Sequence, residues 1–331
     1  MLTQPLINRL CRDAGPPVTL ARERCLRSRF NKNRCTLCLQ ACARRALTLG
    51  DNGLHHDAEE CTGCMQCTAV CPNDAVTGSL DFPALLHEVA AKSSILLSCQ
   101  KGLLGHDHIR IPCVGMFSEA MLAAINAVTR QECFLDTSGC ADCVNSHCLP
   151  AIREKMDKLA SRLQDKSKIR VNYYGDRHAP LPCSGKNARR SILRLFRKNI
   201  TTLSKEAFNP AEPCSARQTA SQDKKPPQTA TVLLHALSQL DEKRKDEGAT
   251  LLSYFFSAAT TNQCDLCPLC TAMCPTGALQ RKKQEEKRTL TYTSARCSGC
   301  GLCADFCKKK ALTIFGGFSG DPHEAQPLAV G

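Results

Sequence analysis

Three stretches of the chain carry cysteines at one spacing, C-x2-C-x2-C-x3-C. They span residues 61–71, 264–274 and 297–307, and a proline follows the first two. Three thiolates placed three residues apart can meet on one tight loop, and the x3 step carries the fourth thiolate away from it. This run is typical of ligands to four-iron (4Fe–4S) clusters. Four-cysteine zinc sites use two separated C-x2-C pairs instead. The pattern therefore predicts iron–sulfur clusters, with zinc as the weaker alternative.

A fourth run is incomplete. It supplies the last three positions of the motif as Cys35, Cys38 and Cys42. Lys32 stands where the first cysteine is expected, and Cys25 is the nearest substitute. Cys11 is a second candidate. If neither coordinates, this site holds a three-iron cluster or none.

Both cysteine-rich ends of the chain resemble bacterial two-cluster ferredoxins. The resemblance covers roughly residues 25–80 and 260–315 and includes the short runs RRALTL, PNDAVTG, PTGALQ and KKALTIF after the four motifs. That family folds as two pseudo-symmetric βαβ-like halves around two clusters with crossed ligands. The resemblance therefore implies four 4Fe–4S clusters. The implied ligand sets are Cys25, Cys35, Cys38 and Cys71; Cys61, Cys64, Cys67 and Cys42; Cys264, Cys267, Cys270 and Cys307; and Cys297, Cys300, Cys303 and Cys274.

Strands and helices are expected to alternate between these two ends. The expected strands span residues 95–99, 108–113, 133–139 and 169–174, and the expected helices span 118–130 and 146–163. Such alternation predicts an open, mostly parallel α/β sheet. Ligands bind beyond the carboxyl ends of the strands in sheets of this kind. Five cysteines follow the expected strands and are predicted to share that rim as a further site: Cys99, Cys113, Cys140, Cys143 and Cys148.

This middle segment resembles the iron–sulfur (delta) subunit of methyl-viologen-reducing hydrogenases. The likeness lies in RIPCVG (110–115), the helix after it and GCADC (139–143). It implies a two-iron (2Fe–2S) cluster and electron transfer between a hydrogenase and a heterodisulfide reductase. Zinc or free, redox-active thiols remain alternatives, because only Cys99 stands near the first strand. Three nearby histidines are expected at the surface rather than as ligands: His106, His108 and His147.

Composition sets the compartment and the partners. The chain has 331 residues, 25 cysteines and a formal net charge of +13. Cysteine at this density, with no secretory signal and no run of about 18 apolar residues, predicts metal ligands in a reducing cytoplasm and no transmembrane segment. The positive charge favours docking to acidic redox proteins over nucleic acid. A basic amphipathic helix at residues 187–206 leaves peripheral membrane contact open.

The expected fold class is α+β, with ferredoxin-like dicluster modules at both ends and a central α/β open-sheet domain. The expected segments are 1–20, an N-terminal extension; 21–80, a dicluster module; 90–176, the α/β cysteine domain; 177–250, a basic helix, a flexible linker (209–231) and a second helix (231–246); 255–316, a second dicluster module; and 317–331, a disordered tail.

These features predict an iron–sulfur electron-transfer protein, a polyferredoxin acting as accessory subunit or carrier. It is expected to pass single electrons between oxidoreductases of the molybdenum-enzyme, hydrogenase or flavoprotein type. No catalytic residue is predicted. Two alternatives stay open: a redox enzyme that uses the middle cysteines, and a structural or assembly protein in which clusters are folding elements.

Overall fold

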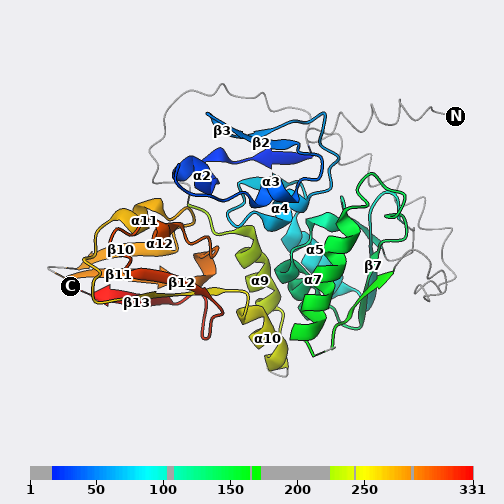
Figure 1. The fold of residues 1–331 in the computed structure, drawn as a ribbon. Coiled ribbons are helices and arrows are strands. Elements are labelled where there is room, and N and C mark those ends of the chain that lie inside the picture. Colours follow the sequence, from blue (N-terminus) through cyan, green and yellow to red (C-terminus); the bar gives the residue numbers. More distant parts are fainter. Residues whose placement is uncertain are drawn as a thin grey trace, which may run out of the picture.

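The computed structural model describes residues 17–102, 108–164, 166–172, 224–241, 244–284 and 287–330 (Figure 1). Cys11, the amphipathic helix expected at 187–206 and most of the expected linker at 209–231 lie outside these residues. Within the described part of the chain, no helix combines the length and the apolar character that crossing a membrane requires.

The N-terminal module consists of two antiparallel strand pairs, three short α-helices and a 3-10 turn, and two of the helices, α3 and α4, contact each other. β1 pairs with β4, and β2 pairs with β3. Its elements are β1 (Val18–Leu20), η1 (Arg22–Arg24), α2 (Leu26–Arg29), α3 (Leu37–Ala41), β2 (Leu47–Gly50), β3 (Gly53–His56), α4 (Gln66–Val70) and β4 (Val76–Gly78). The predicted extension over residues 1–20 is wrong at its end, because β1 supplies the strand that β4 pairs with.

The C-terminal module repeats this order of outer strand, helix, hairpin, helix and outer strand. β9 pairs with β12, and β10 and β11 form the hairpin. Its elements are β9 (Phe256–Thr260), α11 (Leu269–Met273), β10 (Leu279–Gln284), β11 (Lys287–Thr293), η4 (Ser294–Arg296), α12 (Leu302–Asp305), β12 (Leu312–Gly316) and β13 (Ala325–Val330). The matching order agrees with the internal duplication indicated by the cysteine motifs.

The disordered tail predicted for residues 317–331 is wrong for its last part. Ala325–Val330 forms β13, which pairs antiparallel with β11 and makes the hairpin a three-stranded sheet. Pro327 stands opposite Thr291, where the register shifts nearby. Proline is tolerated there because β13 is an edge strand.

The central segment contains a parallel sheet in the order β6-β5-β7-β8. Its strands and helices are α5 (Phe82–Ala91), β5 (Ser94–Ser98), β6 (His108–Arg110), η2 (Val114–Met116), α6 (Glu119–Val128), β7 (Glu132–Asp136), α7 (Cys148–Arg162) and β8 (Ile169–Asn172). The hydroxyl of Ser118 caps α6 by accepting from the Met121 N–H, as its sequence position suggests. The four predicted strands and both predicted helices are confirmed, although β6 ends at Arg110 rather than 113.

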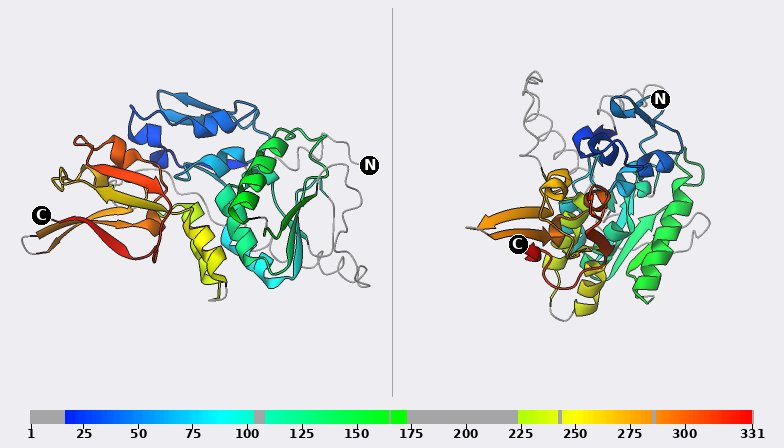
Figure 2. Two further views of the ribbon diagram at one scale, coloured as in Figure 1. Left: turned by 60° about the horizontal axis from the view of Figure 1, so that its bottom comes forward. Right: turned by 60° about the vertical axis from the view of Figure 1, so that its left-hand side comes forward.

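Two helices lie between the C-terminal module and the central sheet (Figures 1 and 2). They are α9 (Gln228–Ser238) and α10 (Lys245–Leu252), where the sequence predicts a single helix over 231–246. α9 contacts α5 and α6 and also η4 of the C-terminal module. α10 is held to the central sheet by an ion pair of 2.8 Å between Lys168 and Glu247.

The buried apolar side chains form two separate cores. One core runs without a break through the N-terminal module, the central sheet and α9–α10. The second core is confined to the C-terminal module and contains eight fully buried residues, two of them cysteines. The N-terminal module is therefore built into the central body, whereas the C-terminal module has a small core of its own.

Candidate iron–sulfur sites

Four cavities in the two modules are each lined by four cysteines, and we number them sites 1 to 4. Site 1 has Cys25, Cys35, Cys38 and Cys71; site 2 has Cys42, Cys61, Cys64 and Cys67; site 3 has Cys274, Cys297, Cys300 and Cys303; site 4 has Cys264, Cys267, Cys270 and Cys307. The structure thus brings together each of the sets that the ferredoxin resemblance implies. In every site one cysteine comes from the other motif of the same module.

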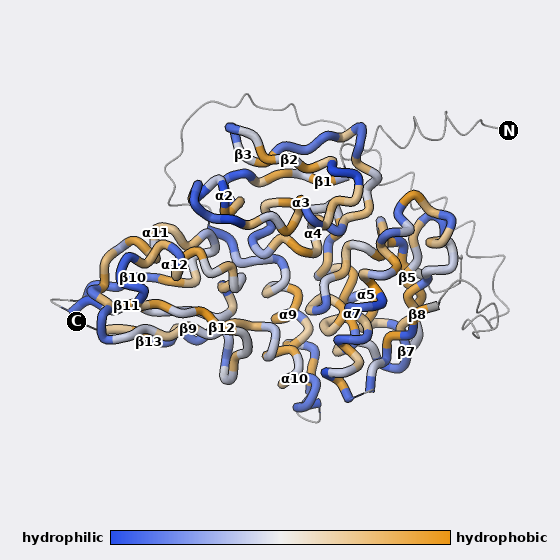
Figure 3. The backbone as a smooth tube through the Cα atoms, viewed as in Figure 1, coloured by the Kyte–Doolittle hydropathy of each residue, from blue (hydrophilic) through white to orange (hydrophobic). Residues whose placement is uncertain are grey.

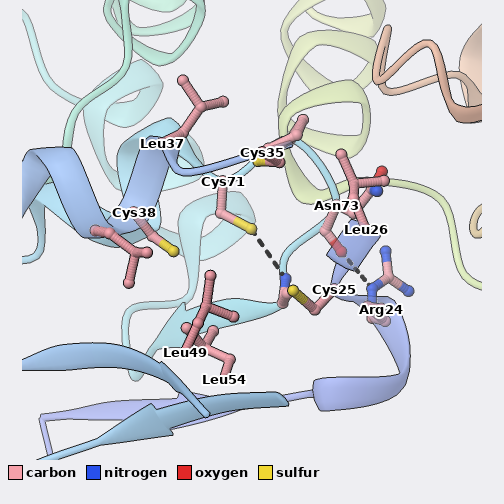
Figure 4. A pocket seen from close by; sticks show the side chains of 13 residues that line it. Arg24, Cys25, Leu26, Cys35, Leu37, Cys38, Leu49, Leu54, Cys71 and Asn73 are labelled. Carbon is pink, nitrogen blue, oxygen red and sulfur yellow. Dashed lines mark hydrogen bonds between the residues drawn. The ribbon is translucent and has the colours of Figure 1, made fainter. Parts of the chain in front are cut away.

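Site 1 shows how the incomplete motif is completed (Figure 4). Cys25 lies between the single turn of η1 and α2. The guanidinium of Arg24 donates to the Asn73 carbonyl and forms an ion pair of 3.4 Å with Asp74, which fixes this turn beside the loop after Cys71. Lys32, at the expected position of the first cysteine, is exposed. Cys25 therefore occupies the place of the missing first cysteine.

All four motifs end in the same turn. The third residue after the last cysteine has a positive φ: Arg45 (55°), Asp74 (52°), Gly277 (71°) and Lys310 (49°). The fourth residue is a buried alanine: Ala46, Ala75, Ala278 and Ala311. In three motifs the alanine N–H donates to the sulfur of the last cysteine, at 3.2, 3.2 and 3.3 Å. The left-handed residue turns the amide toward the sulfur, and such hydrogen bonds tune metal–sulfur sites.

This turn was not predicted, although the sequence contains a pattern that marks it. The spacing C-x3-A occurs after each motif, as CARRA, CPNDA, CPTGA and CKKKA. A small side chain suits this position, because the residue is buried in all four copies. The positive φ at a non-glycine residue costs about 1–2 kcal/mol, so its recurrence at three such positions indicates a requirement for this geometry.

Burial, with a smaller contribution from neighbouring thiols, raises the pKa of several cysteines in these sites. Burial raises the pKa of Cys38 to about 12, and the charges of Cys71, Cys35 and Cys25 add to the shift. Burial and the neighbouring sulfurs likewise raise the pKa of Cys67 to about 12 and that of Cys270 to about 11. Four crowded thiolates need a cationic centre, so an all-sulfur donor set with these shifts fits a bound metal group. No disulfide links the described cysteines.

The distances between the cysteine sulfurs of a site distinguish an iron–sulfur cluster from a single metal ion. A zinc ion holds its sulfurs at about 2.3 Å, so that they lie close to one another. Across the described residues, the single group whose ligand atoms all lie within 4.8 Å of one another is Cys64, His147 and Cys148. Sites 1, 3 and 4 are thus spread more widely than one zinc ion requires, as the sulfurs of an iron–sulfur cluster are.

The five middle cysteines divide into a group of four and a bridge. Burial and the charges of Cys99, Cys113 and Cys143 together raise the pKa of Cys140 to about 12, so these four lie together beyond β5, β6 and β7. We name this group the central site. Cys148 instead lies against site 2, with its sulfur within 4.8 Å of the Cys64 sulfur, and interaction with its thiol lowers the pKa of Cys64 and of Cys113. Cys148 therefore connects the central site, through Cys113, to site 2.

His147 is also corrected, since it lines site 2 rather than an open surface. It directly precedes α7, whose first residue, Cys148, is fully buried against the loop of Cys64. A Cβ added at Gly115 would lie 2.3 Å from the Cys64 carbonyl and 2.8 Å from the Cys148 sulfur. The side chains of His106 and His108 lie outside the described residues. The central segment therefore packs tightly against site 2.

The two modules meet between sites 1 and 3. Phe30 and Phe306 form an edge-to-face pair with ring centroids 5.0 Å apart. The hydroxyl of Ser298 and the side chain of Asn73 share a hydrogen bond. Cys71 of site 1 and Cys297 of site 3 line the same cleft, of about 300 Å³. Further hydrogen bonds across this contact join Arg29 to the carbonyls of Ala272 and Met273, and Asn33 to Asp305.

Paired cysteine cavities inside two modules of the same order define a protein that binds iron–sulfur clusters at both ends. Residues 263–311 match the family described as 4Fe-4S dicluster domain, and residues 54–77 match the family described as 4Fe-4S binding domain. The chain therefore carries ferredoxin-type 4Fe–4S domains near both ends. No curated protein and no solved structure matches it.

Proposed function

We propose that this protein is a one-electron carrier whose modules hold four 4Fe–4S clusters, in the cysteine sets of sites 1 to 4. When bound, such clusters supply reversible one-electron oxidation and reduction. The chain itself supplies the thiolates, directs backbone N–H groups at their sulfurs and keeps the sites largely buried. A reducing cytoplasm is the compartment in which so many unpaired thiols persist.

The observation that carries this proposal is the order of the sites. Site 2 shares a module with site 1, site 1 adjoins site 3 across the cleft of Cys71 and Cys297, and site 3 shares a module with site 4. Neighbouring sites in the series 2–1–3–4 are what conduction of electrons requires. Metal sites that only stabilise a fold need no such order.

We further propose that the central site holds a two-iron cluster next to site 2, at the end of the series opposite site 4. The support is its spread of sulfurs, wider than a single zinc ion requires, and its link to site 2 through Cys113, Cys148 and Cys64. The likeness of this segment to a hydrogenase subunit agrees with such a group.

We propose an acidic redox protein, of the molybdenum-enzyme, hydrogenase or flavoprotein type, as the partner at site 4. Cys267 of this site is the one exposed cysteine in the described part of the chain. Leu290 lines site 4 and pairs with Arg281 across the β10–β11 hairpin, and Lys283 pairs with Arg288 nearer the tip, on the same face. The hairpin lies at the end of the molecule opposite the parallel sheet, and the described parts of its strands nearest the turn are hydrophilic (Figures 2 and 3).

Six exposed side chains make up this basic rim: Arg281, Lys283, Arg288, Lys308, Lys309 and Lys310. Lys309 forms an ion pair of 3.1 Å with Asp265 in the site 4 loop. Residues 281–288 hold five basic and two acidic side chains, so the excess charge is positive. A positive rim speeds the encounter with a negatively charged partner.

Charge reversal tests the basic rim. With a reduced flavodoxin, an acidic one-electron flavoprotein, as donor, Lys283→Glu/Arg288→Glu should lower the electron-transfer rate about tenfold at low salt. Arg130→Glu/Lys166→Glu, an equal change at exposed positions of the central segment, should leave the rate unchanged. Equal effects of the two pairs on the rate would contradict the docking surface. So would an unchanged rate in Lys283→Glu/Arg288→Glu together with loss of DNA binding, because the basic rim would then bind nucleic acid.

Metal analysis tests the carrier function itself. Anaerobically purified protein should contain about 16 iron atoms with matching sulfide, or about 18 with a two-iron central site. It should be reduced by dithionite and reoxidised reversibly. Near-stoichiometric zinc with little iron would overturn the carrier proposal and favour a structural protein.

Thiol redox chemistry at Cys113 and Cys148 is a second candidate. Their thiols interact beside Cys64 of site 2, and this interaction raises the pKa of Cys148. Two such thiols can form a disulfide by releasing two protons and passing two electrons, one at a time, to site 2. Native alkylation of Cys113 or Cys148 would support this chemistry. Absence of labelling, which their burial favours, would count against it.

A further inference from the structure

Site 2 differs from the other sites by two histidines in its wall. His56 ends β3 and His147 precedes α7, and both line this cavity. In both imidazoles Nε2 is buried and has no hydrogen-bond partner among the described residues. A buried nitrogen without a partner costs free energy. Two such nitrogens at one cavity indicate a partner that the polypeptide does not supply.

The walls of the other cavities are different. Site 1 is lined mainly by leucines: Leu26, Leu37, Leu39, Leu49 and Leu54. Site 3 has Tyr292, whose hydroxyl donates to the Phe256 carbonyl at 2.6 Å and is thereby satisfied. Site 4 has Leu290 beside Lys308 and Lys309. Within the described residues no histidine lines sites 1, 3 or 4.

We propose that His56 and His147 donate Nε2–H hydrogen bonds to the sulfurs of the group bound at site 2 and raise its reduction potential above those of the other three sites. This inference rests on the proposed function. A neutral imidazole carries one N–H donor. Reduction adds negative charge to an iron–sulfur group, so donors aimed at its sulfurs stabilise the reduced form. Both histidines act only as hydrogen-bond donors, and neither is oxidised or reduced.

His147 makes this effect depend on the central segment. One of its ring nitrogens lies within 4.8 Å of the sulfurs of Cys64 and Cys148. The loop that carries it is held to the N-terminal module by a hydrogen bond of 3.2 Å from the Asn145 amide to the Thr62 carbonyl. The central segment thus supplies one of the two donors to a site whose cysteines all belong to the N-terminal module.

A higher potential at site 2 gives electron transfer along the series a preferred direction, from site 4 to site 2. With the highest potential at site 2, an electron that enters at site 4 moves along the series and comes to rest beside Cys64. That position adjoins Cys148 and the central site. The two histidines therefore make the series a path toward the central cysteines rather than a symmetric wire.

The test is a redox titration of the full chain, purified anaerobically, with the one-electron waves resolved. His56→Leu and His147→Leu should each shift one wave to a more negative potential. His56→Gln should shift it less, because the amide keeps an N–H donor near the position of Nε2. His55→Leu is the matched control, since His55 lies on the same strand, points to the opposite face and does not line site 2.

Three results would overturn the inference. One is no shift in either leucine variant at full iron content, which leaves the carrier function intact. Another is a shift of equal size in His55→Leu, which indicates a general effect of the strand. The third is one zinc per chain that is lost in His147→Leu, because His147 is then a ligand with Cys64 and Cys148. A chain with little iron overturns both this inference and the proposed function.

Discussion

The two ferredoxin-type modules have the same order of elements but different surroundings. The N-terminal module has an irregular first motif, shares its core with the central sheet and presents site 2 to the central cysteines. The C-terminal module has two regular motifs, its own small core, an additional strand and an exposed cysteine beside basic side chains. One repeated unit has thus been fitted into the body of the protein, while the other forms its end. Because of this difference, site 2 of the N-terminal module lies inside the protein, and site 4 of the C-terminal module lies at its surface.

The largest expected difference between the modules appears when iron is removed. Much of the small C-terminal core is cysteine and its neighbours, so anaerobic chelation should abolish its structure. The central sheet should persist, because its core is continuous and mostly aliphatic. Hydrogen exchange should show complete loss of protection in β9–β13 and retained protection in β5 and β7. Equal loss in both regions would show that the two cores are not independent.

The next largest effect is loss of one ligand at matched positions. Cys25→Ala and Cys264→Ala remove the first cysteine of site 1 and of site 4. Each should convert a four-iron site into a three-iron site, lowering iron by about one atom per chain, or empty it, lowering iron by about four. Iron analysis with electron paramagnetic resonance checks this. An unchanged iron content in Cys25→Ala would exclude Cys25 as a ligand and direct attention to Cys11.

Sequence reasoning predicted which cysteines come together, but less about what surrounds them. Spacing indicated the motifs, the resemblance to two-cluster ferredoxins implied the crossed sets, and even Cys25 could be chosen because few cysteines stand near Lys32. The role of His147 could not be predicted, since it depends on how α7 packs against another module. β13 was missed because its glycine- and proline-rich approach resembles disorder, and its pairing partner β11 lies far back in the chain. The alanine turn was visible but was not recognised.

A smaller effect is expected where the central segment touches site 2. Gly115→Ala places a Cβ 2.3 Å from the Cys64 carbonyl, so the contact must open. Overpacking of this kind costs about 1–3 kcal/mol and should also lower iron at site 2. Gly316→Ala in β12 is the matched control, because no atom lies within 4 Å of its added Cβ. Denaturant unfolding followed by cluster absorbance checks both. Equal stability of the two variants would contradict the close packing at Cys64.

The smallest effect concerns the contact that joins the inner and outer modules. The edge-to-face pair of Phe30 and Phe306 should contribute about 0.5–1.5 kcal/mol of coupling in a double-mutant cycle of alanine substitutions. Phe30→Ala with Phe315→Ala is the control cycle and should be additive, since Phe315 is half exposed on β12 and does not pair with Phe30. The free energies of unfolding provide the coupling. Because the same contact brings Cys71 and Cys297 to one cleft, the double variant should also slow electron transfer between the modules. Coupling that is absent while transfer stays fast would mean that the remaining contacts, such as those of Arg29 with the 272–273 carbonyls, hold sites 1 and 3 together by themselves.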